Sequence, residues 1–215
     1  MMQNGNESAF NNYGQIAEIP FRVFEYLMNN TSQDAENLWK ALRYDDINPL
    51  RHKNLTLKEK RSLIWDGSPE EDYKFRVFNK PLMTDDLADN TNTTPSPIQF
   101  RMYRYGLIPS TQLSGAILFE IDTYSGDKVA YMRNENNVPV ERTDYLESKL
   151  LTLLNGVDIG FGYDFLQFNK EVSRTSQSLL SINNGKLFYG RAMVLGLRWS
   201  VPQSDGNCEW LMIRR

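Results

Sequence analysis

The chain has few of the residues that build metal centres and disulfide frameworks. Its 215 residues include one histidine, His52, and one cysteine, Cys208. A single cysteine excludes a disulfide within the chain, which agrees with assembly in a reducing cytoplasm. No cluster of Asp, Glu or His at metal-ligand spacing surrounds His52, which lies in a polar stretch between Arg51 and Lys53. We expect no metal, no cofactor and a solvated His52, although a base brought to Cys208 by the fold is not excluded.

Long apolar runs and an excess of positive charge are also missing. The longest apolar runs, such as 192–195 and 116–119, are far shorter than the roughly 20 residues of a membrane-spanning helix. Residues 1–12 lack the basic and apolar regions of a signal peptide. With 24 basic and 27 acidic residues, the chain has no global attraction for nucleic acid or for an anionic membrane. Any contact with DNA must therefore be local.

The apolar content is sufficient for one folded domain. Hydrophobic residues make up 40% of the chain, so a chain of this length can bury a core in a single domain. We divide it into an N-terminal arm (1–19), one domain (20–201) and a C-terminal tail (202–215). The domain carries an exposed loop insertion at about 66–97, because the run 85–96 is rich in Asp, Asn, Thr and Pro.

Three short helices are expected in the first third of the chain. Apolar residues at helical spacing after Pro20 predict the first helix. The second begins at Ser32 or two residues later and ends near Tyr44, with acidic residues in its first turn, where the helix dipole favours them. Thr56, followed three residues later by Glu59, has the capping-box pattern that begins a third helix. The apolar positions of the first two helices are Phe21, Phe24, Leu27 and Met28, and Ala35, Leu38, Trp39 and Leu42.

Two antiparallel strands are expected next. Basic residues alternate with aromatic or apolar ones from Gln99 to Tyr105, which predicts a strand with one buried and one cationic face. We expect Pro109 to end this strand. Residues 116–124 alternate in the same way. Their predicted faces are Ile117, Phe119, Ile121 and Thr123 on one side, and Leu118, Glu120, Asp122 and Tyr124 on the other.

A long helix and a second pair of strands complete the pattern. A strong helical stripe follows residues 141–144, and Asn155 with Gly156 provides a left-handed exit. Residues 161–168 and 187–201 are expected to be strands, joined by a polar connection rich in Ser and Asn. The order of elements predicts an α+β fold in which helices pack on one face of a largely antiparallel sheet. The stripe consists of Tyr145, Leu146, Leu150, Leu153 and Leu154.

Several short segments resemble one viral protein family. The segments FRVFEYLM (21–28), ENLWKALRY (36–44) and NLTLKEK (54–60) resemble the N-terminal part of neck and tail-joint proteins of tailed bacteriophages, including crAss-like phages. The strand ILFEI (117–121), the helix end LLTLLNG (150–156) and the strands that follow look like the tail-terminator or head-tail joining fold. The similarity covers most of the expected domain and lies in the order of elements, not in a catalytic signature.

The resemblance implies a non-enzymatic structural protein of a virion. It implies a homo-oligomeric ring of six or twelve copies around the DNA channel. Its partners would be the portal or adaptor and the tail proteins, with no membrane contact, and assembly would take place in the cytoplasm of the bacterial host. Residues 66–97 and 171–186 are long for a minimal terminator fold, which leaves the level of the ring in the neck open.

Two segments are candidates for contacts between molecules. Arg101, Tyr103, Arg104 and Tyr105 combine cations with aromatic rings, and a ring multiplies a few positive charges per subunit along a DNA channel. The alternative, favoured by the negative net charge, is that they form ordinary strand faces and salt bridges between subunits. The second candidate is the apolar segment at the C-terminus, expected to dock on a neighbour: Trp210, Leu211, Met212, Ile213, Arg214 and Arg215.

Two other classes of function stay open. One is a small DNA-binding module built on the strand from Arg101 to Tyr105, which would bind DNA as a monomer in a salt-dependent way. The other is an enzyme whose carboxylates and Tyr or Ser groups form no linear motif and converge only in the fold.

Overall fold

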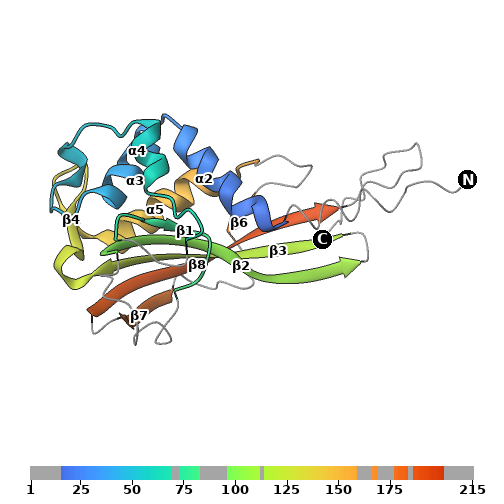
Figure 1. Ribbon diagram of the computed structural model, residues 1–215. Helices are drawn as coiled ribbons and strands as arrows, with labels where there is room; N and C mark the ends of the chain where they lie inside the picture. Colours follow the sequence, from blue (N-terminus) through green and yellow to red (C-terminus); the bar gives the residue numbers. More distant parts are fainter. Residues whose placement is uncertain are drawn as a thin grey trace, which may run out of the picture.

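The protein folds into two layers, with helices on one face of a twisted sheet (Figure 1). The α+β fold expected from the order of elements is therefore confirmed. None of the helices that the structure describes is both long and apolar enough to cross a membrane. The computed structural model describes residues 16–68, 73–82, 96–111, 114–158, 166–168, 177–183 and 186–200.

The helical layer is built from the two parts of the chain that show helical periodicity. Ser32 Oγ accepts the backbone N–H of Ala35, and Thr56 and Glu59 form the complete capping box, so both predicted helix starts are confirmed. Gly156, with φ 85°, takes the left-handed conformation expected after the last helix. The elements of this layer are η1 (Ile16–Glu18), α2 (Ile19–Asn29), α3 (Gln33–Arg43), η2 (Pro49–Arg51), α4 (Leu57–Ser62), η3 (Asp127–Val129) and α5 (Arg142–Leu154).

The main sheet of the described chain has six strands: β1 (Val77–Phe78), β2 (Ile98–Thr111), β3 (Ser114–Gly126), β6 (Gln167–Phe168), β7 (Gln177–Asn183) and β8 (Lys186–Ser200). They lie in the order β1-β2-β3-β8-β6, and β7 also pairs with β8. Only the pairing of β1 with β2 is parallel. A separate hairpin is formed by β4 (Tyr131–Arg133) and β5 (Pro139–Glu141).

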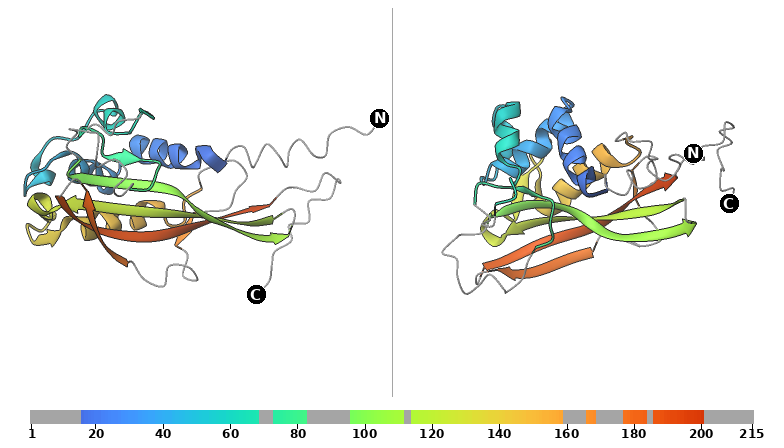
Figure 2. Two further views of the ribbon diagram at one scale, coloured as in Figure 1. Left: turned by 60° about the horizontal axis from the view of Figure 1, so that its bottom comes forward. Right: turned by 45° about the vertical axis from the view of Figure 1, so that its right-hand side comes forward.

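Three strands are much longer than the helices that cover them. β2, β3 and β8 have 14, 13 and 15 residues, so each extends about 45 Å at roughly 3.3 Å per residue. The 13-residue helix α5 is only about 20 Å long at 1.5 Å per residue. One end of the sheet therefore projects beyond the helical layer, as Figures 1 and 2 show.

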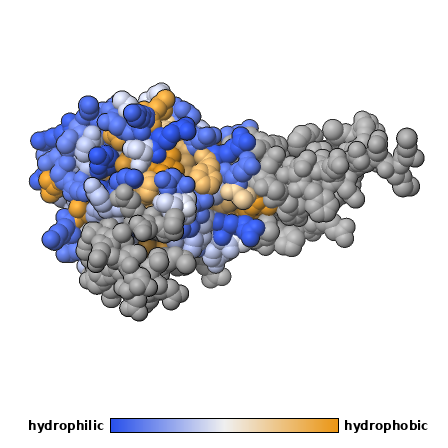
Figure 3. Space-filling view, viewed as in Figure 1, coloured by the Kyte–Doolittle hydropathy of each residue, from blue (hydrophilic) through white to orange (hydrophobic). Residues whose placement is uncertain are grey.

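The core lies between the helices and the apolar face of these strands. Phe24 of α2 meets Phe100 of β2 edge to face, with ring centroids 5.6 Å apart. The predicted faces of β3 are confirmed, because Ile117, Phe119 and Ile121 all join the core. Hydrophilic residues cover most of the coloured surface in Figure 3, and hydrophobic ones form patches mainly along its middle. The other strand residues of the core are Ile98, Phe100 and Met102 of β2, and Met193, Leu195 and Leu197 of β8.

The expectation that Pro109 ends its strand is wrong. β2 continues to Thr111, and Pro109 pairs with Gly115 of β3. Proline lacks a backbone N–H, which excludes it from the interior of a sheet but not from an edge. At Pro109, β2 has a described neighbour on one side only, so the missing N–H is tolerated.

Two expected loops contain strands. The expected insertion at 66–97 is not exposed throughout, because Phe75, Val77 and Phe78 are buried and β1 joins the edge of the sheet. The expected polar connection before β8 contains β7, which forms a hairpin with β8. Most of the run 85–96 and residues 161–165 lie outside the described residues.

Arg142 is buried at the start of α5 and ties this helix to the end of α3. Its Nη1 donates to the carbonyl oxygens of Ala41 and Tyr44 at 2.8 and 3.0 Å. Its Nη2 donates to the carbonyl of Asp46, and its Nε to that of Val129, both at 2.8 Å. Ala41 lies in the last turn of α3, where carbonyls have no partner within the helix and the dipole favours a cation. Burial lowers the pKa of Arg142 to about 10, so the guanidinium stays charged at neutral pH.

Replacing Arg142 with methionine is expected to lower the free energy of unfolding by about 4 kcal/mol or more. Four backbone carbonyls lose a donor, and each buried acceptor left unpaired costs about 1–3 kcal/mol. Arg142→Lys, which keeps the charge but not the forked geometry, should lose less. Urea unfolding followed by circular dichroism measures both losses. Arg61→Met, at an exposed position of α4, is the control, and an equal loss there would contradict the assigned role.

Candidate functional site

The face of the sheet turned away from the helices carries a ladder of polar side chains. These residues alternate along β2 and β3 with the residues of the apolar core, so they project from the opposite face. Most of them are buried, and this face is therefore not a solvated polar surface. The opposing pairs of the ladder are Gln99 with Tyr124, Arg101 with Asp122, and Tyr103 with Glu120.

Arg101 is fully buried within the ladder. Its Nε donates to Gln99 Oε1 at 2.8 Å, and its Nη1 donates to the carbonyls of Lys80 and Pro81 at 3.3 and 3.0 Å. The guanidinium also lies 4.2 Å from the centre of the Phe78 ring. The segment after β1 is thus held against the sheet by Arg101. The expected cationic strand face is wrong at this residue, because the returning segment covers the guanidinium and takes up its donors.

Arg104 and Tyr105 lie at a β-bulge farther along β2. Arg104 pairs with Phe119 and Gly106 with Leu118, which makes Tyr105 the extra residue. Arg104 is exposed and points to the face opposite that of Arg101, because the two residues are an odd number of positions, three, apart along the strand. The structure therefore does not gather the four candidate residues of β2 in one surface. Arg101 and Tyr103 belong to the ladder, whereas Arg104 and Tyr105 belong to the open edge of the sheet.

Asp122 is the most perturbed carboxyl group of the ladder. Its Oδ2 accepts hydrogen bonds from the hydroxyls of Tyr103 and Tyr124 at 2.9 and 3.4 Å. Its buried Oδ1 has no hydrogen-bond partner among the described residues. Burial, and then the negative charge of Glu120, raise the pKa of Asp122 to about 6. Burial also raises the pKa of Tyr103 and Tyr124, so both hydroxyls remain donors.

Gly190 of β8 allows the ring of Tyr124 to lie against the neighbouring strand. A Cβ atom at this position would come within 2.7 Å of Tyr124 Cδ1 and 2.8 Å of the carbonyl oxygen of Thr123. Both distances are shorter than a contact between carbon or oxygen atoms allows, and one of them involves backbone. The ladder thus depends on a glycine within a strand. The sequence alone does not distinguish this glycine from one in an ordinary turn.

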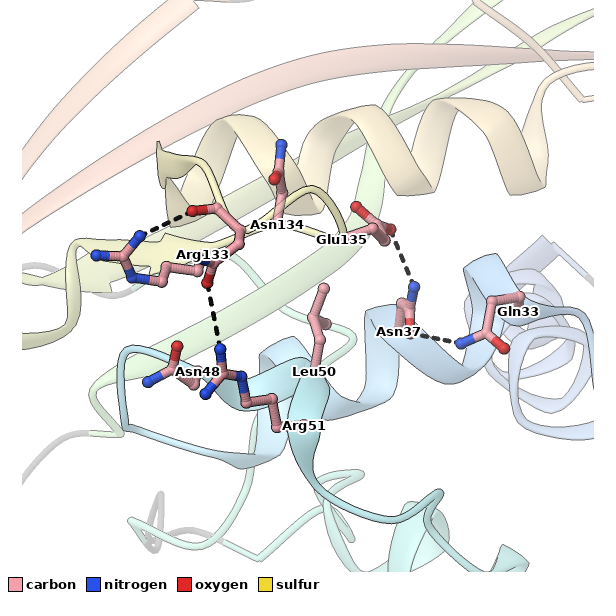
Figure 4. A pocket seen from close by; sticks show the side chains of 9 residues that line it. Gln33, Asn37, Asn48, Leu50, Arg51, Arg133, Asn134 and Glu135 are labelled. Carbon is pink, nitrogen blue, oxygen red and sulfur yellow. Dashed lines mark hydrogen bonds between the residues drawn. The ribbon is translucent and has the colours of Figure 1, made fainter.

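A pocket of about 330 Å³ lies at the end of the molecule opposite the projecting strands, between α3 and η2 on one side and the turn between β4 and β5 on the other (Figures 1 and 4). Five carboxamide side chains, two arginines, Glu135 and Leu50 line it. Glu135 accepts hydrogen bonds from Asn37 and Tyr145 at 2.9 and 2.7 Å and pairs with Lys149 at 2.9 Å. Although burial opposes it, these bonds lower the pKa of Glu135 to about 2, so it cannot act as a base near neutral pH.

The remaining candidates from the sequence lie at the surface or outside the described residues. His52 is exposed as expected, with its Nε2 2.7 Å from Asp46 Oδ2 and its ring stacked on Tyr44. Within the described ranges, no three His, Cys, Asp or Glu side chains are placed to hold a metal ion. Residues 1–15, Cys208 and the candidate contact from Trp210 to Arg215 lie outside the described residues, although Ile16 and Ile19 of the expected arm are buried.

Comparison with known proteins gives no relative. No protein-family model, no curated protein and no solved structure matches this chain.

Replacing Asp122 with asparagine is expected to stabilise the protein at neutral pH. The pKa of Asp122 is about 6 in the folded protein, against an ordinary value of 3.8. Between these values the folded state binds a proton that the unfolded state does not. Ionised Asp122 therefore destabilises the folded protein above pH 6, by about 3 kcal/mol. This destabilisation disappears as the pH falls from 6 to below 3.8.

Asparagine removes this dependence, because it carries no charge at any pH. Asp122→Asn should exceed the parent in stability by about 1–3 kcal/mol at pH 7.5 and approach it at pH 4, as measured by urea unfolding at each pH. Asp127→Asn, at an exposed position of η3, is the control. A difference between Asp122→Asn and the parent that does not vary with pH would rule out the raised pKa.

Proposed function

We propose that this chain is a structural virion protein of a tailed bacteriophage, which forms a ring of identical copies in the neck. The ring would surround the DNA channel and join the capsid portal to the tail. The proposal combines the sequence resemblance with one feature of the fold, the projection of β2, β3 and β8 beyond the helices (Figure 2). The copy number, six or twelve, and the level in the neck stay open.

The projecting part of the sheet has an open edge on each side among the described residues. β1 pairs with β2 only at Phe100 and Arg101. On the other side, the pairing of β6 and β7 with β8 ends at Gly196. Beyond these points β2 and β8 pair only with β3, which lies between them.

Open edges of this kind fit a ring. Their unpaired N–H and C=O groups readily pair with a strand of another chain. The two edges belong to different strands on opposite sides of the sheet, so pairing of one with the other joins copies head to tail. Head-to-tail contacts of this type close into rings when the rotation between copies permits. This supports self-assembly as the main role of the projecting strands.

The two rival classes find less support in the described residues. Glu135 and Asp122 accept hydrogen bonds from side chains of the fold, and the pKa of the tyrosines that donate to them is raised by burial, so these hydroxyls stay protonated. A strand face that binds DNA would need several exposed cations. In the segment from Arg101 to Tyr105, Arg101 is buried and only Arg104 is an exposed arginine. The side chains with the strongest interactions thus serve the fold, which favours a structural protein.

Native mass spectrometry of the full chain, alone and with co-expressed virion proteins, is expected to show a closed ring. Tyr105→Lys places a charge at the exposed bulge of the β2 edge, so it should weaken self-association about tenfold or more and leave the melting temperature unchanged. Tyr73→Lys is the matched control, because Tyr73 is 65% exposed and lies outside the sheet, while Tyr105 is 55% exposed.

The proposal fails if the chain stays a monomer or dimer with every partner tested. The assignment of the β2 edge as the contact between copies is wrong if Tyr73→Lys weakens association as much as Tyr105→Lys. In that case added charge, and not the β2 edge, would be the cause.

A further inference from the structure

The pocket between η2 and the β4–β5 turn holds two arginines without a described acidic partner. Arg51 Nη2 donates to Asn137 Oδ1 at 3.4 Å, and Arg133 Nη1 donates to the carbonyl oxygen of Asn137 at 2.8 Å (Figure 4). Both guanidinium groups are therefore held beside one residue. Two positive charges bound to one residue repel each other, and an anion bound by both would offset that repulsion.

The nearest carboxylates do not supply this anion, because each has its own partners. Glu135 pairs with Lys149 and accepts hydrogen bonds from Asn37 and Tyr145. Asp46 contacts the ring of His52 through Oδ2 and accepts the backbone N–H of Asn48 through Oδ1, both at 2.7 Å. The N–H groups of Arg51 and Arg133 that are not bonded to Asn137 thus remain available to a ligand.

Hydrogen bonds order the backbone of the β4–β5 hairpin, which carries Arg133 and Asn137. Asn134 Oδ1 accepts the N–H groups of Asn136 and Val138, each at 3.0 Å, and Asn137 takes a left-handed conformation with φ 61°. The backbone N–H of Arg133 donates to the carbonyl of Ile47 at 2.7 Å, which joins the hairpin to the loop before η2. A site ordered in this way needs little rearrangement to bind.

Three exposed apolar or aromatic side chains belong to the segments that form the pocket. Ile47 and Val138, each next in sequence to a pocket residue, are both 49% exposed. Tyr131 is 64% exposed and lies on the same face of β4 as Arg133, two residues away. Figure 3 shows small hydrophobic areas at this end of the molecule. Arginine and tyrosine beside exposed apolar residues are typical of surfaces that bind other proteins.

We propose that this surface, formed by Arg51, Arg133, Ile47, Val138 and Tyr131, binds an acidic segment of a partner protein. A carboxylate of that segment lies between the two guanidinium groups, whose fork geometry matches its two oxygens. Apolar residues of the partner pack on the surrounding apolar side chains. The surface is at the end of the molecule opposite the projecting strands, so the proposal does not depend on ring formation (Figure 1).

A nucleic acid fits this surface less well. Its phosphate backbone binds best to a track of several cations, whereas two arginines lie here with Glu135 and Asp46 close by. The chain also has a formal net charge of −3, which repels a polyanion at long range.

Titration of the full chain with a hexaglutamate peptide, followed by NMR of the arginine Nε–Hε signals, tests the proposal. The signals of Arg51 and Arg133 should shift, and Arg51→Gln/Arg133→Gln should bind at least about tenfold more weakly than the parent. Arg61→Gln, an exposed arginine of α4, is the matched control and should bind like the parent. Arg51→Lys keeps the charge with less risk to the fold, because Arg51 is exposed, and should give an intermediate loss.

Three results would overturn the proposal. Equal weakening by Arg61→Gln would show a general attraction between peptide and protein. Tighter binding of a hexathymidine oligonucleotide than of hexaglutamate would assign the surface to nucleic acid. Inorganic phosphate that shifts the same signals at the same concentration as the peptide would reduce the site to one for small oxyanions.

Discussion

The buried guanidinium of Arg142 is the interaction on which the other parts of the molecule depend. It joins the end of α3, the loop at Asp46 and η3 through four backbone carbonyls. Ala41 and Arg142 are 101 residues apart in sequence, so the early helices and α5 are positioned by one side chain. The first turn of α5 is also tied to the sheet, because Asp144 Oδ1 pairs with Arg191 Nε of β8 at 2.6 Å. The helical layer and the sheet are thereby fixed to each other at this point.

Features governed by neighbouring residues were predictable from the sequence. The capping box of Thr56 and Glu59, the alternation in β3 and the left-handed exit at Gly156 need only residues within a few positions of one another. The members of the apolar stripe of α5 are buried as expected. These signals were sufficient for an α+β fold with helices on one face of the sheet.

Features that depend on distant segments were not predictable. The pattern around Arg101 is that of a cationic face, and only the return of residues 80 and 81 to the sheet turns it into a buried contact. β1 contributes two residues to the sheet, too few for any periodicity. The pocket draws its arginines from segments 82 residues apart and its amides from α3, the loop before η2 and the β4–β5 turn. Such sites have no linear signature, because the fold alone brings their members together.

The position of β8 sets the time at which the sheet can be completed. This strand is the last one of the described chain to leave the ribosome, yet it pairs with β3 from Phe188 to Ser200 and with β6 and β7 on its other side. Until it is synthesised, β3 has an open edge, and the strand contacts of the core are incomplete. Folding of the sheet therefore finishes only after β8 has been synthesised. Nascent chains on one messenger share the open edge of β3 until then, so slower synthesis of the segment from β3 to β8 lengthens the time in which these edges can pair with one another.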